Sequence, residues 1–125
     1  MSLQPWTIRR NASLHEAAAI MREHQIRHLP VLDGGRLIGL LSIRDIHLVE
    51  GMRGVDPKQT TVEDAMTSDV YAVQESVDLD KVVEQMADRR LGSAVVVDRH
   101  GEVRGIFTTV DALQVLCDTL RRISA

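Results

Sequence analysis

The same pattern occurs twice along this chain of 125 residues, and the repeat limits the possible folds more than any other feature. Each copy has an apolar stripe at helical spacing, then a short apolar run ending in Asp, then Gly-x-x-Ser/Thr-x-x-Asp. The second copy is one residue longer than the first. The extra residue falls in a turn, where a repeat tolerates an insertion. Two copies of one unit predict a pseudo-twofold arrangement with related clefts where the copies meet. The segments cover residues 14–21, 26–33 and 39–45 in the first copy and residues 79–86, 91–98 and 105–111 in the second.

Composition restricts the class of protein. Two units of about 55 residues are each marginally stable alone, so we expect them to bury apolar faces on each other. A net charge of −3 does not indicate a basic surface for nucleic acid, and a single Trp, Tyr and Phe do not indicate an aromatic surface for stacking bases. The sequence has no apolar run long enough to span a membrane and no signal peptide, and its single cysteine, Cys117, cannot form an internal disulfide. We therefore expect a cytoplasmic protein that binds neither membrane nor nucleic acid.

Local signals predict the order of elements. Ser13 and Asp78 stand where N-caps are expected, each before a helix with an apolar stripe. The short runs after these helices, at residues 29–32 and 94–97, read as buried strands that continue into hairpins. A helix then starts near residues 42 and 108, and a strand is expected at residues 70–73. The predicted fold is α/β, with a β-α-β-β-α repeat at residues 1–50, a Gly/Pro-containing linker at 51–60 and a second repeat at 61–125.

The sequence resembles a tandem pair of cystathionine β-synthase (CBS) domains over nearly its whole length. The matching features are Val62-x-Asp64-x-Met66-Thr67, the two apolar runs and the two Gly-x-x-Ser/Thr-x-x-Asp endings. Their order, spacing and duplication together make the match specific. The resemblance implies two pseudo-twofold-related repeats packed as one module. It also implies a regulatory sensor that binds an adenine nucleotide or related adenosyl ligand between the repeats, and a homodimer with an unknown protein target.

The Ser/Thr-x-x-Asp endings allow two interpretations. A hydroxyl at a strand-to-helix junction caps the helix, and the helix N-terminus attracts an anion such as phosphate. The resemblance implies that Asp45 and Asp111 hold ribose hydroxyls, with Ser42 and Thr108 near the phosphates. The alternative is a capping box, in which the acid only stabilises the helix. Because the pattern is duplicated, we favour the ligand role.

In the family, each cleft takes residues from both repeats, and the resemblance implies two clefts of different charge. Arg27 and His28 would offer cationic or donor groups to phosphate near Asp111, unless they form only a solvated turn before a strand. Gly92 and Ser93 are small and neutral, and Arg44 would partly compensate for them. One expected cleft comprises Ser42, Arg44, Asp45, Thr67, Val70, Leu91, Gly92 and Ser93. The other comprises Thr108, Val110, Asp111, residues 5–8, Ile26, Arg27 and His28.

One feature departs from the family pattern. The second repeat has a full lead-in at residues 62–67, whereas the first begins almost at Met1, with Pro5-Trp6 where its lead-in strand should lie. The wall of the cleft at Asp111 is therefore expected to be atypical. We expect Trp6 to cover the cleft opening or to lie at a subunit contact.

Catalytic chemistry has little support in the sequence. The five histidines are scattered, without the spacing of a metal site, and Ser42 has no base beside it. We predict a non-catalytic protein with no required cofactor and no metal, whose ligand is AMP, ADP, ATP or another adenosyl compound. The alternative is a ligand-free interaction or dimerisation module. The apolar positions expected at a homodimer contact are Ile43, Ile46, Val110, Leu113 and Leu116.

Overall fold

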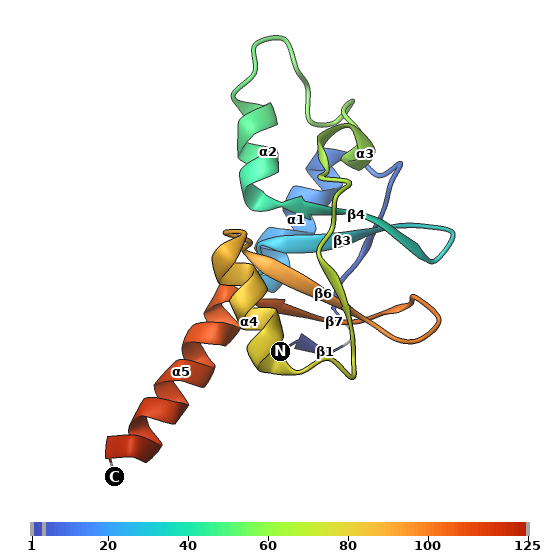
Figure 1. The fold of residues 1–125 in the computed structure, drawn as a ribbon. Coiled ribbons are helices and arrows are strands. Elements are labelled where there is room, and N and C mark those ends of the chain that lie inside the picture. Colours follow the sequence, from blue (N-terminus) through green and yellow to red (C-terminus); the bar gives the residue numbers. More distant parts are fainter. Residues whose placement is uncertain (1, 4, 125) are drawn as a thin grey trace. The chain divides into compact units, whose positions relative to one another are not determined.

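The computed structural model describes residues 2–3 and 5–124, and the chain forms two compact units. The first unit is Trp6–Val70. The second unit combines the N-terminal segment before Trp6 with the chain from Tyr71 onward. Figure 1 shows the elements of both units along the chain. No helix in the described ranges is long and apolar enough to cross a membrane.

The first unit has a three-stranded sheet in the order β2-β3-β4, with β2 parallel and β4 antiparallel to β3. A glycine in β4 allows a later segment to lie against this sheet: a Cβ on Gly39 would meet the Met66 side chain and the Thr67 carbonyl oxygen. The backbones of Thr67 and Leu40 exchange two hydrogen bonds of 2.9 Å. The lead-in at residues 62–67 therefore packs within the first unit. Its elements are β2 (Ile8–Arg9), α1 (Leu14–His24), β3 (His28–Asp33), β4 (Arg36–Ser42), α2 (Ile43–Glu50) and α3 (Val62–Ala65).

The second unit repeats this scheme with one additional strand. Its four-stranded sheet has the order β1-β7-β6-β5, in which β5 is parallel to β6 and the other pairs are antiparallel. The β-α-β-β-α order predicted from the sequence is confirmed in both units. The elements are β1 (Ser2–Leu3), β5 (Ala72–Gln74), α4 (Leu79–Asp88), β6 (Ser93–Val97), β7 (Val103–Thr108) and α5 (Thr109–Ser124).

The two cores fill equivalent positions with different side chains. On the central hairpin of the first unit, Leu29 lies opposite Leu41, and both are fully buried. At the same place in the second unit, Ala94 lies opposite Phe107. A small residue facing a large one thus replaces two of intermediate size, which conserves volume across the pair. The remaining fully buried large apolar residues of the first core include Leu14, Met21, Val31, Ile46 and Val62, and the second core is completed by Val82 and Met86.

Two local predictions need correction or adjustment. Ser13 caps α1 as expected, accepting a 3.1 Å hydrogen bond from the Glu16 backbone. Asp78 occupies the N-cap position of α4 as expected, but its side chain makes no cap hydrogen bond. A capping Asp78 side chain would accept a hydrogen bond from the Lys81 backbone N–H, but this N–H donates to the Asp78 carbonyl oxygen instead, at 3.1 Å. The strand expected at residues 70–73 lies slightly later, as β5.

Candidate functional site

In the first unit, the Ser/Thr-x-x-Asp motif forms a reciprocal cap where β4 meets α2. Ser42 is the N-cap residue and has extended backbone angles. Its Oγ accepts from the Asp45 backbone N–H at 3.2 Å, and Asp45 Oδ2 accepts from the Ser42 backbone N–H at 2.9 Å. The motif therefore fixes the Asp45 carboxylate at the start of α2.

The second unit builds the same device where β7 meets α5. Asp111 Oδ2 accepts from the Thr108 backbone N–H at 2.8 Å and from the Thr108 hydroxyl at 3.2 Å. The Asp111 backbone N–H lies 3.4 Å from Thr108 Oγ1, to which it donates. Both aspartates are half-buried at a helix N-terminus, where backbone N–H groups and the helix dipole favour negative charge.

Capping occupies only part of the Asp45 carboxylate. The capping hydrogen bond goes to Oδ2, and among the described residues Oδ1 accepts none. A carboxylate has about four lone-pair positions, so one oxygen can cap the helix while the other accepts ligand hydroxyls. The capping box is thus present at Ser42 and Asp45, but its presence does not exclude a role of Asp45 in binding a ligand.

Arg27 and His28 lie beside the first of these motifs within their own unit. The Ile43 backbone N–H donates to the Arg27 carbonyl at 2.8 Å, and His28 lies opposite Ser42 across the β3–β4 pair. Burial lowers the pKa of the His28 imidazole below its ordinary value of 6.5. The positive charge of Arg27 lowers this pKa further, and the Asp45 carboxylate partly opposes the shift. The start of α2 is therefore accompanied by basic side chains.

The equivalent place in the second unit is neutral. The Thr109 backbone N–H donates to the Gly92 carbonyl at 3.1 Å, and Ser93 lies opposite Thr108. Ser93 is buried, and Leu91 packs against the second core. The difference in charge between the two motifs thus follows from the first residue of β3 and of β6 and the residue just before each strand.

The other predicted site residues occupy varied surroundings. Thr67 is hydrogen-bonded through its backbone to Leu40, which precedes Ser42 by two residues in the first unit. Ile26 packs against the first core. Arg44 is exposed one residue before Asp45, and Val110 is exposed at the start of α5. The pairing of residues from one repeat with those of the other remains a prediction, as does any shared role of Val70.

The profile of the CBS domain family matches residues 1–49 and 62–118, one stretch for each copy of the repeat. The chain belongs to the CBS domain family. Two relatives from Methanocaldococcus jannaschii align with 89% of the chain: protein MJ1232 at 31% identity and L-aspartate semialdehyde sulfurtransferase at 33%. The chain spans only 36% and 21% of the length of these two relatives.

Solved CBS structures share the fold. The CBS domain pair of protein MJ0100, solved with 5′-methylthioadenosine and S-adenosyl-L-methionine, is 32% identical with a TM-score of 0.81. The alignment covers 92% of this chain and 93% of that one. The cytosolic domain of the Mg²⁺ channel MgtE, solved with ATP, is 31% identical with a TM-score of 0.73, over 88% of this chain and 44% of that one.

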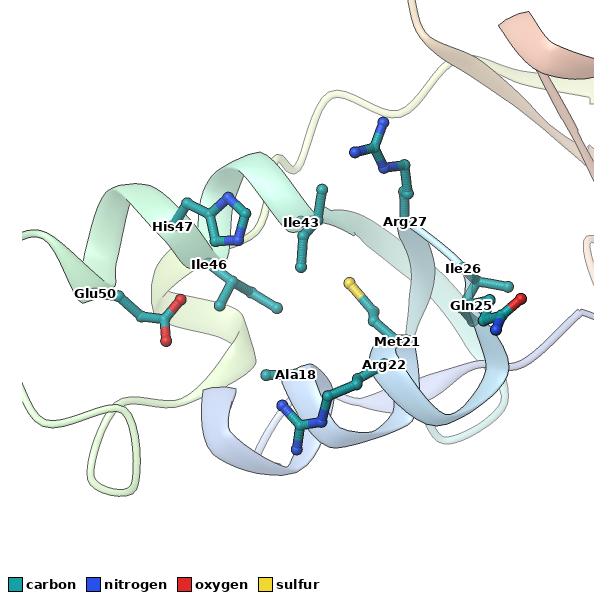
Figure 2. A pocket seen from close by; sticks show the side chains of 10 residues that line it. All are labelled: Ala18, Met21, Arg22, Gln25, Ile26, Arg27, Ile43, Ile46, His47 and Glu50. Atoms are coloured by element: carbon teal, nitrogen blue, oxygen red, sulfur yellow. The ribbon is translucent and has the colours of Figure 1, made fainter.

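Two features of the first CBS repeat were not predicted from the sequence, the stacking partner of Trp6 and a groove between two helices. Trp6 stacks on His24 of α1, with ring centroids 3.8 Å apart and an interplanar angle of 18°. Half of its surface remains exposed, at 52%. A groove of about 550 Å³ also lies between α1 and α2 (Figure 2). It is lined by Ala18, Met21, Arg22, Gln25, Ile26, Arg27, Ile43, Ile46, His47 and Glu50. Ile46 is almost fully buried at the floor of this groove, so it is not the exposed contact that the sequence suggested.

The lowered pKa of His28 predicts that acid destabilises this CBS pair. As the pH falls below 6.5, the unfolded chain gains a proton on His28 while the folded chain does not. Stability is therefore lost from that pH downward until the folded-state pKa is passed. The free energy of unfolding from urea titrations should fall less steeply with acidification in His28→Gln than in the parent. His15→Gln, on the exposed side of α1, is the control for removing an imidazole, and equal slopes for His28→Gln and the parent would contradict the prediction.

Proposed function

We propose that this CBS pair is a non-catalytic regulatory module that binds an adenine nucleotide or related adenosyl ligand between its repeats. The observation that carries the proposal is the duplicated Ser/Thr–Asp cap, which holds one carboxylate at the start of α2 and one at the start of α5. The adenosyl compounds in the MJ0100 structure and the ATP in the MgtE structure support this class of ligand.

The proposed roles follow from the chemistry of each group. Asp45 and Asp111 accept hydrogen bonds from ribose hydroxyls, for which an ionised carboxylate is a strong acceptor. The first backbone N–H groups of α2 and α5, beside Ser42 and Thr108, favour phosphate or another anionic group. Arg27 and His28 add positive or donor groups to one cleft. We expect no cofactor beyond this ligand.

The proposed output is a population shift. A ligand that contacts both repeats stabilises the arrangement of repeats in which it makes more contacts. The altered surface is then recognised by a protein target, within a homodimer of this chain. A ligand-free dimerisation module is the second candidate, because several large apolar side chains of α5 are exposed.

Differential scanning fluorimetry against AMP, ADP, ATP and S-adenosylmethionine tests the binding proposal, with GTP as the control that keeps the ribose and phosphates but replaces adenine. A ligand that binds only the folded state stabilises it by about 2.7 kcal/mol at one hundred times its Kd. For a domain of this size, this amounts to roughly 5–15 °C in melting temperature. If no adenosyl compound at millimolar concentration raises the melting temperature, the ligand-free module is the better description.

A further inference from the structure

Each repeat joins an aromatic residue that precedes its first parallel strand to a basic residue at the end of its first helix. In the first unit, the Trp6 ring stacks on His24 with the ring centroids 3.8 Å apart. In the second unit, the Arg89 guanidinium lies over the Tyr71 ring, 5.3 Å from its centroid. His24 is the last residue of α1, and Arg89 is the C-cap residue of α4. Each pair therefore connects the start of a repeat to the end of its first helix.

The two aromatic–basic pairs occupy equivalent places in their repeats. Trp6 stands two residues before Ile8 of β2, and Tyr71 stands two residues before Val73 of β5. Ile8 and Val73 are equivalent, because each is paired in parallel with the same position of the repeated apolar run, on β3 and on β6. The basic partners are equivalent as well, since each stands directly before a non-glycine residue with a positive φ. The contact thus recurs with different side chains, which indicates a role that both repeats share.

In the first unit, the turn after the basic residue has a backbone that needs support. Gln25 has a φ of 54°, in the left-handed region that is uncommon for residues other than glycine. Such a conformation persists where the surrounding structure holds it. The Met21 carbonyl accepts the backbone N–H groups of Gln25 and Ile26, the latter at 3.0 Å. The stack of Trp6 on His24 adds a side-chain contact at the residue directly before this turn.

The turn at Gln25 leads into the basic residues of the proposed ligand site. Arg27 follows Gln25 by two residues, and its carbonyl accepts the Ile43 backbone N–H at 2.8 Å. His28 is the first residue of β3 and lies opposite Ser42. The positions of Arg27 and His28 at the start of α2 therefore depend on how this turn is held.

We propose that Trp6 is a positioning residue for Arg27 and His28, which in turn face an anionic group of the ligand. Trp6 acts through its stack on His24, which holds the intervening turn. The inference rests on the proposed function and adds to it the residue that controls selectivity for phosphate-bearing adenosyl compounds. The pair at Tyr71 holds the equivalent turn of the second unit, which leads to uncharged residues. Loss of the Trp6 stack should therefore lower phosphate selectivity, whereas loss of the Tyr71 contact should not.

Calorimetric titration with ATP and with 5′-methylthioadenosine, which has no phosphate, tests this role. In Trp6→Leu, we expect the Kd for ATP to rise about tenfold, as for one lost charge-assisted hydrogen bond, and the Kd for 5′-methylthioadenosine to change less than about threefold. His24→Leu removes the other partner and should act in the same way. Trp6→Phe keeps an aromatic ring against His24 and should stay close to the parent. Tyr71→Leu is the matched control and should leave the ratio of the two Kd values unchanged.

A second measurement needs no ligand. Burial and the charge of Arg27 lower the pKa of His28, and the Asp45 carboxylate opposes this shift, so the pKa responds to the position of the turn. In an NMR titration of the His28 imidazole, Trp6→Leu should bring this pKa closer to its ordinary value of 6.5 than it is in the parent. Tyr71→Leu should not move it, because Tyr71 belongs to the other unit.

Reduced ATP selectivity and a changed pKa of His28 in Trp6→Leu, with neither in Tyr71→Leu, support the positioning role. Equal weakening of both ligands in Trp6→Leu would overturn it, because a merely structural defect acts on both. An unchanged pKa of His28, or the same loss of selectivity in Tyr71→Leu, would overturn it as well. If the parent binds neither ligand while the pKa of His28 moves in Trp6→Leu, the hold of Trp6 on the turn is supported and the proposed ligand function is refuted.

Discussion

Replacing Asp111 or Asp45 by Asn is expected to weaken nucleotide binding about ten- to a hundredfold while leaving most of the folding stability intact. The Asn amide oxygen can still accept the backbone N–H of Thr108 or Ser42, as Oδ2 does in the parent. The ligand side then lacks a charged acceptor, and a charge-assisted hydrogen bond contributes about 1.5–3 kcal/mol. Losing a helix cap altogether costs about 0.5–2 kcal/mol of stability, and the Asn variants should lose less than this.

Calorimetric titration of both variants separates ribose recognition from capping. Asp98→Asn is the matched control: its Oδ1 accepts backbone N–H groups from His100 and Glu102 in a turn, so the same change is made outside the proposed clefts. If Asp45→Asn and Asp111→Asn bind like the parent and both lose stability, these aspartates act as helix caps only.

The ranking of the two variants carries further information. With Arg27 and His28 contributing to the cleft at Asp111, as proposed, Asp111→Asn is the more damaging change. Within the first unit these two residues lie beside Ser42, and the Asp45 charge acts on His28. The opposite ranking would therefore assign Arg27 and His28 to the cleft at Asp45.

The sequence predicted those parts of the fold that are governed by local periodicity and by the repeat. The stripe around Ala17 and Met21, and the caps at Ser13 and Ser42, each depend on residues within a few positions, and the structure confirms them. Duplication strengthened each prediction, because a pattern that is weak once is specific when it recurs in the same order. The reciprocal bonds of Ser42 with Asp45 could be anticipated for the same reason.

The features that escaped prediction depend on residues distant in sequence. The stacking of Trp6 on His24 has no local signature, and neither has the packing of Thr67 on Leu40 in the first unit. The α1–α2 groove requires two helices to be positioned by the sheet beneath them. At Asp78, the residue type was suitable for a cap, but a backbone bond satisfied the same N–H group. Residue type alone cannot decide such a competition.

Leu29→Ala is expected to destabilise the first unit by about 2–5 kcal/mol. Leu29 and its cross-strand partner Leu41 are each 0% exposed, so the truncation leaves a cavity that the surrounding strands can close only in part. A typical domain has about 5–15 kcal/mol of stability in total, so the loss should be evident in urea unfolding. A change of less than about 1 kcal/mol would show that the site collapses freely around the smaller residue.

The second unit suggests how to repair that cavity. There the same pair of positions holds Ala94 opposite Phe107, and both are buried. Leu29→Ala/Leu41→Phe reproduces this combination in the first unit, whereas Leu41→Phe alone overpacks the core at a cost of about 1–3 kcal/mol. We expect the double variant to be more stable than the sum of the single changes predicts, with a favourable coupling of about 0.5–3 kcal/mol. If the stability changes of the two single variants simply add in the double variant, the aromatic ring at position 41 does not fill the cavity at position 29. That result would contradict the expected compensation of volume between the two positions.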